Sequence, residues 1–400
     1  MPAGFLRKLF SREAAQPFET TKVIAEKKEK RIEAKRLAPF EVAFDTRAST
    51  EHPELNQDAC VVDAVRQMLM VADGVGGVAK GEIASRAAQE AMGIYDIYLD
   101  ELMDQKCAQS GVPYLTVDQA SEIMDTHFSL IADYVHDAVK NASEVKSVTA
   151  AATTLLTAKV FETAPGERYV IVKSVGDSYP MVRRADGTVE MIDIEEDGIV
   201  QSWVKKGEVT EDELFLISES GSHEELAETY TEFAEKQGLE ISPEKMSSLK
   251  KRFDSYFGNG SRRQARSEIT QYVGKSRSEK ISIHSAVVKV NPGDQLFFST
   301  DGIDALRRRQ IQDVLRGEGT VVEKTKALVS AATEANSIEK IRTKPDDITV
   351  VGMQVPEDSA VLEQTRQTAR LAEVERVKQE DRVNAEAARL KAFSRAKSVE

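Results

Sequence analysis

The stretch Phe298-Ser299-Thr300-Asp301-Gly302-Ile303-Asp304 places an aspartate and a glycine directly after an apolar run that is typical of a buried strand. Val71-Ala72-Asp73-Gly74-Val75-Gly76-Gly77 has the same arrangement at the end of an earlier run. Asn56-Gln57-Asp58 and Pro345-Asp346-Asp347-Ile348-Thr349-Val350-Val351 instead lead into predicted strands. Strand ends are rigid, and glycine lets the backbone approach a ligand closely. These aspartates are therefore candidates for one shared site.

A single Asp-Gly pair is most often a turn, so each motif alone predicts little. Four such motifs, each beside a strand, indicate carboxylates that converge if the strands are neighbours. Carboxylates that lie so close together cannot all stay ionised without a compensating charge. A set of oxygen ligands favours hard cations such as Mg²⁺ or Mn²⁺. The sequence therefore predicts a divalent cation site.

The order of the predicted elements gives the fold class. Strands gather in clusters and helices gather in clusters, which indicates an α+β sandwich rather than a regular βαβ repeat. The residues about 212–260 interrupt this scheme with a helix-rich insertion, in which Ser242-Pro243-Glu244 is a good helix start. The predicted strands are 40–45, 59–63, 67–72, 153–161, 169–175, 179–183, 282–290, 295–299 and 348–354, and the predicted helices are 81–103, 116–142, 304–316 and 321–335.

Charge divides the chain into three parts. Residues 1–36 carry ten Lys/Arg and five Glu and are expected to form a charged arm, whereas 357–400 form a charged, helical tail with nine residues of each sign. The domain between them, 37–356, therefore holds −18 against a total of −13. Because phosphate neutralisation needs Lys and Arg, so acidic a domain is not expected to bind nucleic acid.

Overall composition indicates whether disulfides or membrane helices are expected, and therefore which location is expected. The sequence holds two cysteines, Cys60 and Cys107, so a disulfide scaffold is not expected. It has no apolar run of about 18 residues that would predict a membrane helix, and its start does not resemble a secretory signal. We therefore expect no membrane association and a cytoplasmic location.

The motifs taken in order carry a family resemblance. The series NQD, VADGVGG, AATTLLTA, VGDS, FFSTDGIDAL and PDDITVV resembles the PPM family, the PP2C-type metal-dependent protein phosphatases, in its bacterial style. The resemblance covers roughly residues 40–355 without the insertion. It implies a four-layer α-β-β-α sandwich, with two antiparallel sheets flanked by helices. It also implies hydrolysis of phosphoserine and phosphothreonine esters in a phosphoprotein substrate.

The resemblance also assigns roles to individual residues. Asp73 resembles the aspartate that bridges two Mg²⁺ or Mn²⁺ ions, and the carbonyl of Gly74 resembles a ligand of one of them. Asp301 and Asp346 resemble the ligands that complete one metal ion. Asp58 resembles the acidic residue on the other metal ion, where it often acts through water. Asp73 and Asp301 would then support catalysis through a metal-activated water, without a protein nucleophile.

Three positions depart from the family pattern. The family usually places an arginine shortly before the NQD aspartate, where it binds the substrate phosphate, but Pro53 stands there. Arg47 from a longer loop and His52 are both candidates for this role, although only a guanidinium can bind phosphate in a bidentate manner. Val145–Ala152 lacks the aspartate expected for a third metal, so no third ion is predicted. Tyr179-Pro180 replaces the more usual arginine after VGDS.

Two other functions fit parts of the sequence. Gly74-Val-Gly76-Gly-Val-Ala79 matches the GxGxxA pattern of a dinucleotide-binding oxidoreductase, but Asp73 would repel the pyrophosphate and no βαβ unit follows. A catalytically weak phosphatase-like domain that binds a partner is the second alternative, since the arginine is displaced. The insertion and the C-terminal helix are candidate contacts for a protein partner in either case.

Overall fold

The computed structural model describes residues 41–75, 80–146, 151–258, 264–274, 281–338 and 343–356. The chain separates into one unit at 1–39 and a second from residue 40 onward, and the fold below belongs to the second unit. The predicted arm at 1–36 and tail at 357–400 lie outside the described residues. No helix in the described ranges is both long enough and apolar enough to cross a membrane.

Two five-stranded antiparallel sheets form the centre of the fold, and we name them sheet A and sheet B. Sheet A has the order β1-β12-β11-β8-β9 and sheet B the order β10-β7-β6-β3-β2. The strands of sheet A are β1 (Val42–Arg47), β12 (Ile348–Gln354), β11 (Gln295–Ser299), β8 (Tyr179–Arg183) and β9 (Val189–Met191). The strands of sheet B are β10 (His284–Val290), β7 (Glu167–Val175), β6 (Leu155–Ala164), β3 (Met68–Ala72) and β2 (Ala59–Asp63). The short strands β4 (Gly74–Val75) and β5 (Ala152–Thr153), which follow β3 and precede β6 in the chain, pair as a small two-stranded antiparallel sheet.

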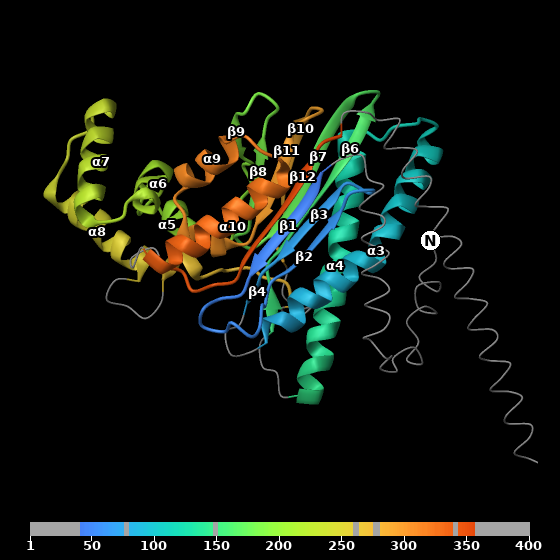
Figure 1. Ribbon diagram of the computed structural model, residues 1–400, viewed down its shortest axis with the longest axis horizontal. Helices are drawn as coiled ribbons and strands as arrows, with labels where there is room; N and C mark the ends of the chain where they lie inside the picture. Colours follow the sequence, from blue (N-terminus) through green and yellow to red (C-terminus); the bar gives the residue numbers. More distant parts are fainter. Residues whose placement is uncertain are drawn as a thin grey trace, which may run out of the picture. The chain divides into compact units, whose positions relative to one another are not determined.

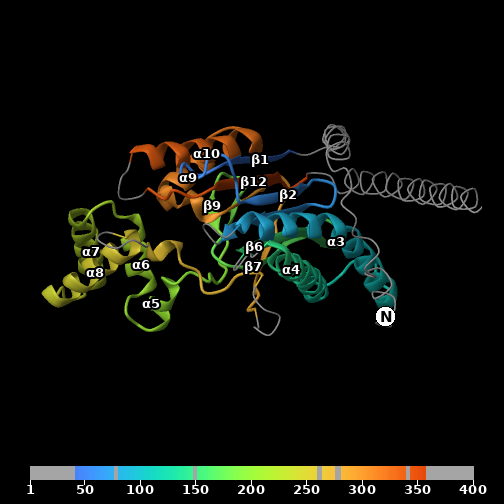
Figure 2. The same ribbon diagram turned by 90° about the horizontal axis from the view of Figure 1, so that it is seen from below.

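The sheets pack face to face and helices cover their outer faces (Figure 1, Figure 2). Apolar side chains of both sheets, among them Val71 and Val351, form the core between them. The paired helices α3 (Gly81–Ser110) and α4 (Val117–Lys146) cover sheet B, and α9 (Arg308–Arg316) and α10 (Val321–Ile338) cover sheet A. The predicted four-layer α-β-β-α sandwich is confirmed.

Burial on both faces explains the sequence of the central strands. In β3 all five residues are buried, and β12 is buried over six of its seven residues. Each of these strands contacts the opposite sheet on one face and a helix on the other. A strand covered on both faces needs a continuous apolar run instead of an alternating one. The runs at 68–72 and 348–353 are of this kind.

The insertion consists of helices with a core of their own. Its helices are α5 (Gln201–Lys205), α6 (Glu211–Glu219), α7 (His223–Gln237) and α8 (Pro243–Phe257). Thr210 and Glu213 form a capping box at the start of α6, and Ser242 caps α8 as the sequence predicts. Trp203 packs into the same core as Phe253, so the helical module begins about ten residues earlier than residue 212.

Several boundaries differ from the sequence prediction. The first strand begins at Val42 rather than at residue 40, and the helix expected at 304–316 is divided into the 3-10 turn η4 (Asp301–Ala305) and α9. The short strands β4 and β9 were not predicted. Strands of two or three residues are too short to show a period, and they form because a neighbouring strand supplies the hydrogen bonds.

Candidate metal centre

Antiparallel pairing inside each sheet brings the aspartates together in pairs. In sheet B, Ala59 lies opposite Ala72, so Asp58 before β2 and Asp73 after β3 stand at the same end of the ladder. In sheet A, β11 and β12 pair with Ser299 opposite Val350. Asp301 therefore follows β11 at the end where Asp346 precedes β12. The sequence could place each aspartate at a strand end, but the pairing decides which ends coincide.

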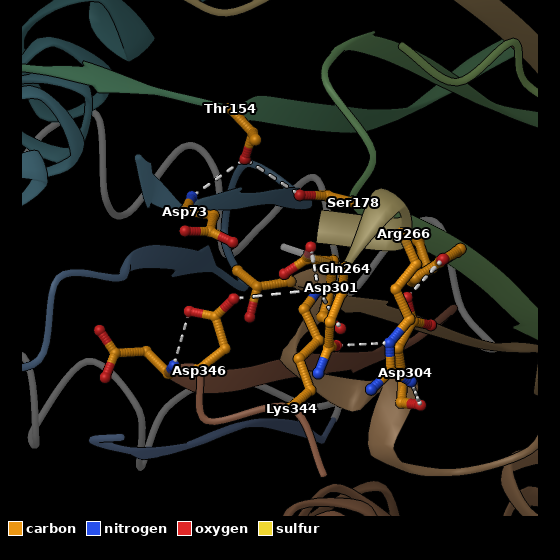
Figure 3. A network of polar contacts seen from close by, with 12 residues as sticks. Asp73, Thr154, Ser178, Gln264, Arg266, Asp301, Asp304, Lys344 and Asp346 are labelled. Carbon is orange, nitrogen blue, oxygen red and sulfur yellow. Dashed lines mark hydrogen bonds and ion pairs between the residues drawn. The ribbon is translucent and has the colours of Figure 1, made fainter. Parts of the chain in front are cut away.

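Packing of the two sheets then brings the pairs into one cluster. Carboxylate oxygens of Asp73, Asp301 and Asp346 all lie within 4.8 Å of one another. In Figure 3 these three side chains converge from different elements on a common space. The structure thus brings together the three residues that the sequence analysis assigned to one metal ion.

Asp58 joins this cluster through a bond between the sheets. The hydroxyl of Thr300 donates to Oδ2 of Asp58 at 2.9 Å. Thr300 is itself held in place, because its hydroxyl accepts a hydrogen bond from the backbone N–H of Thr349 at 3.0 Å. Sequence analysis did not single out Thr300, although its position beside Asp301 was a usable signal.

Two carboxylate oxygens of the cluster are buried without a hydrogen-bond partner among the described residues, Oδ1 of Asp58 and Oδ1 of Asp301. Asp301 is only 5% exposed, so water cannot solvate this oxygen freely. A buried carboxylate oxygen without a donor costs free energy comparable to a lost hydrogen bond or more. Buried carboxylate oxygens without a donor are the type of ligand that a hard divalent cation binds. The residues present therefore fit a divalent metal ion.

Electrostatics lead to the same conclusion. Burial raises the pKa of Asp73 well above its usual range, and the charges of Asp58 and Asp346 raise it further. Burial also raises the pKa of Asp58, against a lowering by the hydrogen bond with Thr349. Burial and the charge of Asp301 raise the pKa of Asp346 to about 7. The metal-free cluster therefore carries more negative charge than its surroundings stabilise, and a cation would relieve it.

The backbone of Asp73 is fixed by two threonines of the AATT motif. The carbonyl of Asp73 accepts from the N–H of Thr154 at 2.9 Å and from the hydroxyl of Thr153 at 2.7 Å, while its N–H donates to the hydroxyl of Thr154 at 3.0 Å. The Thr154 hydroxyl also contacts that of Ser178 at 3.1 Å. With its backbone satisfied in this way, Asp73 has its carboxylate available for a ligand.

Glycines allow the close packing of the backbone around the site. A side chain at Gly74 would overlap the carbonyl oxygen of Gln57, and one at Gly81 would overlap the carbonyl of Gly74. A side chain at Gly302 would overlap the carbonyl oxygen of Asp347. The two Asp-Gly pairs therefore have glycine for a steric reason that the sequence pattern alone does not reveal.

Asp347 holds the loop that carries Asp58. Its Oδ1 accepts from the N–H of Ser49 at 2.7 Å, and its Oδ2 accepts from the N–H of Gln57 at 2.6 Å. Because both carboxylate oxygens bind backbone, Asp347 orients the segment 49–57. This position supports the cluster without facing it as a ligand.

The two candidates for phosphate binding lie in different surroundings. Arg47 is exposed at the end of β1, opposite Ile348, and so stands at the cluster end of sheet A. His52 contacts the carbonyl of Leu55 through Nδ1 at 2.8 Å and lies 3.7 Å from Asp347. Within the described ranges, no ion pair or hydrogen bond joins either residue to Asp73, Asp301 or Asp346.

Lys344 also belongs to the cluster, although the sequence did not predict it as a site residue. Lys344 is 1% exposed and its ammonium contacts Oδ2 of Asp301 (Figure 3). A lysine in a polar segment normally predicts a solvated side chain. No local pattern around residue 344 indicated that it would be buried among carboxylates.

Comparison with known protein families shows to which family this chain belongs. The family described as protein phosphatase 2C matches residues 48–343, which is most of the chain. The chain belongs to the protein phosphatase 2C family. The antiparallel pairing of β3 with both of its neighbours also removes the dinucleotide-binding alternative, which needs parallel strands.

Solved structures of protein phosphatase 2C enzymes share this fold. The serine/threonine phosphatase PstP/Ppp of Mycobacterium tuberculosis is 18% identical, with a TM-score of 0.50 over 79% of this chain and 99% of that chain. The serine/threonine phosphatase Stp1 of Staphylococcus aureus is 19% identical, with a TM-score of 0.50 over 79% of this chain and 95% of that chain. A search of curated proteins by sequence gives no significant match. At these identities the structures establish the fold, and the residues of the site must be argued from this chain.

Proposed function

We propose that this chain is a metal-dependent protein serine/threonine phosphatase that hydrolyses phosphoserine and phosphothreonine esters with two Mg²⁺ or Mn²⁺ ions. The observation that supports it most is the convergence of Asp73, Asp301 and Asp346, with Asp58 beside them. Two buried oxygens of this cluster have no hydrogen-bond partner among the described residues. The proposed ligands are the side chains of these four aspartates and the carbonyl of Gly74. A third metal ion is not proposed.

Residues in and around the cluster would contribute to this reaction in different ways. Bound divalent ions would supply an activated water and neutralise charge on the phosphoryl oxygens. The backbone of Asp73 is fixed by hydrogen bonds to Thr153 and Thr154, so its carboxylate keeps its position in the centre. Asp347 orients the loop 49–57 and thereby places Asp58.

Arg47 is our candidate for the residue that binds the substrate phosphate. Its side chain is exposed at the cluster end of sheet A, whereas Nδ1 of His52 is already engaged with a backbone carbonyl. A guanidinium also matches the geometry of phosphate better than an imidazole does. Replacement of Arg47 by Ala should raise KM for a phosphopeptide more than it lowers kcat.

Turnover of p-nitrophenyl phosphate and of a phosphothreonine peptide with Mn²⁺ tests the proposed function. Asp73→Asn and Asp301→Asn should each abolish Mn²⁺-dependent turnover. Asp294→Asn is the matched control, because Asp294 is 1% exposed and binds Arg184 and the N–H of Ala185 in a turn outside the cluster. Turnover that is indifferent to chelator, or that survives Asp73→Asn, would refute the proposal.

The alternative of a phosphatase-like binding module predicts a different outcome in the same assay. Such a protein would bind Mn²⁺ at the cluster but hydrolyse neither substrate. The departures at Pro53 and Tyr179-Pro180 motivate this alternative.

We propose the domain boundaries 1–36, 37–356 and 357–400 together with contacts to a protein partner through the helical insertion or the tail. A cytoplasmic location stays a prediction. Deletion of 357–400 should leave hydrolysis of p-nitrophenyl phosphate intact and weaken partner binding, if the tail makes that contact.

A further inference from the structure

The ammonium of Lys344 lies inside the acidic cluster. It donates to Oδ2 of Asp301 and to the backbone carbonyl of Asp301 at 3.2 Å, and it stands 3.8 Å from Oδ2 of Asp346. The ammonium of Lys344 therefore lies between two of the proposed metal ligands.

The backbone of Lys344 is held so that its side chain reaches the cluster. Its N–H donates to Oδ1 of Asn336 at 2.8 Å, and its carbonyl accepts from the N–H of Asp346 at 2.7 Å, which closes a tight turn about Pro345. The preceding carbonyl, that of Thr343, accepts from Gln264 at 3.1 Å and from Arg266 at 3.2 Å. These bonds come from different elements, so the segment is braced from several sides (Figure 3).

The charge of Lys344 is distributed unevenly over the cluster. It compensates Asp301 and Asp346, at the ends of sheet A strands. Among the described residues, no lysine or arginine forms an ion pair with Asp58 or Asp73, at the ends of sheet B strands. Within the part of the chain that the structure describes, one half of the centre thus contains a cationic side chain and the other half has none.

We propose that the ammonium of Lys344 occupies the cation position between Asp301 and Asp346, so that a divalent ion binds there only by displacing it. The position at Asp58 and Asp73 is open to a first ion without any displacement. This inference rests on the proposed metal dependence and adds a residue that sets the affinity of one metal position. Like charges in a partly desolvated site repel strongly, so an ammonium and a divalent ion exclude each other there.

The physical consequence is two unequal metal sites. The first ion should bind with ordinary affinity, whereas the second must also break the contact between Lys344 and Asp301. The second affinity should therefore be lower by at least about tenfold, a factor that corresponds to about 1.4 kcal/mol. Occupancy of the second site would then vary with the concentration of free metal over a range in which the first site is already full.

Equilibrium dialysis and isothermal titration of the full chain with Mn²⁺, after removal of metal by chelator, test the proposal. The wild type should bind two ions with dissociation constants at least about tenfold apart. Lys344→Met should bring the weaker constant close to the stronger one. Lys344→Arg keeps the charge and should retain the unequal constants.

Lys324→Met is the matched control. Lys324 lies in α10, is 2% exposed and donates to the carbonyl of Gly319, which precedes the helix. Its replacement therefore tests the loss of a buried lysine outside the cluster. Its Mn²⁺ constants should equal those of the wild type. If Lys344→Met requires metal to fold, dialysis of protein refolded in Mn²⁺ still counts the bound ions.

Four outcomes separate this inference from the proposed function. Equal constants in the wild type, or a Lys344→Met titration identical to the wild type, overturn the role of Lys344 while metal dependence stands. Two tight ions in Lys344→Arg also overturn it, because charge would then not be the cause. Absence of Mn²⁺ binding in both the wild type and Lys344→Met overturns the proposed function itself.

Discussion

Thr300 and Asp58 are joined across the two sheets by a hydrogen bond of 2.9 Å, from the hydroxyl of Thr300 to Oδ2 of Asp58. Thr300 follows a strand of sheet A, and Asp58 precedes a strand of sheet B. The bond therefore couples the packing of the sandwich to the position of a proposed metal ligand.

Removal of this hydroxyl should harm both stability and metal binding. Thr300→Val keeps the volume but leaves a buried carboxylate oxygen without its donor, and it should lower the free energy of unfolding by about 1.5–3 kcal/mol. It should also weaken Mn²⁺ binding several-fold, because Asp58 loses its orientation. Chemical denaturation and Mn²⁺ titration measure the two effects.

Thr157→Val is the control for that substitution. Thr157 is fully buried in sheet B, and its hydroxyl has no hydrogen-bond partner among the described residues. Its removal should be neutral or stabilising. Equal losses from Thr300→Val and Thr157→Val would contradict a specific role for the bond between the sheets.

Arg266 should be essential for the segment that carries Lys344. Its guanidinium donates to the carbonyls of Asp304 and Thr343, each at 3.2 Å, and lies 5.0 Å from the ring centre of Phe257. Arg266→Met should destabilise the protein by about 2–4 kcal/mol, because buried carbonyls lose a charged donor. Thermal unfolding in chelator measures this loss.

A second arginine provides the comparison. Arg252 lies 4.8 Å from the ring centre of Trp203 and pairs with Glu208 inside the insertion. Arg252→Met should cost about 1 kcal/mol or less, since both members of the pair are partly exposed. Arg266→Lys should fail to restore stability, because an ammonium cannot reach the same carbonyls in a fork geometry. A similar small loss for both arginines would disprove the bracing role.

Substitution of Gly302 should be far more damaging than substitution of a glycine on a helix surface. An alanine at residue 302 would overlap the carbonyl oxygen of Asp347, and backbone cannot move aside cheaply. We expect a loss of more than about 3 kcal/mol for Gly302→Ala. Gly93 in α3 has open space around it, so Gly93→Ala should stabilise by about 0.5–1 kcal/mol. Urea denaturation of both variants checks the contrast, and a tolerated Gly302→Ala would show that the close approach is not needed.

Glu196 should make stability depend on pH. Burial, and then the charge of Asp304, raises the pKa of Glu196 from 4.5 to about 7. The folded chain therefore keeps a proton that the unfolded chain has lost. The resulting cost is absent below about pH 4.5, grows as the pH rises, and is complete above about pH 7.

Replacement by the neutral isostere tests the sign of this effect. Glu196→Gln should be more stable than the wild type at pH 8, by about 1–3 kcal/mol, and the difference should vanish near pH 4.5. Unfolding is measured in chelator so that metal binding does not contribute. Parallel stability curves for the two proteins between pH 5 and pH 8 would contradict the prediction.

The proposed metal ligands were accessible to sequence reasoning because each aspartate is marked by its neighbours. Asp73 and Asp301 follow apolar runs and precede glycine, and Asp346 precedes another apolar run. An apolar run reports burial through residues one or two positions away, so it can be recognised without knowledge of the rest of the chain. The four-layer sandwich followed from the same local patterns and from the family resemblance.

Lys344, Thr300 and Arg266 could not be assigned in this way. The contact of Lys344 with Asp301 joins residues 43 positions apart, and that of Thr300 with Asp58 joins residues 242 positions apart. Trp203 is likewise part of the insertion because it packs into the same core as Phe253, 50 positions later in the chain. No periodic signal in the chain encodes such partners.

The sequence by itself determined where most of the strands and helices form and which strand ends carry aspartate, because those properties depend on side-chain period and on residues close in the chain. The tertiary structure decided which strand ends meet, and that a lysine completes one half of the acidic cluster. Those outcomes depend on sheet pairing and on the packing of one sheet against the other. They bring charges from distant segments close together, and burial strengthens the interactions between these charges.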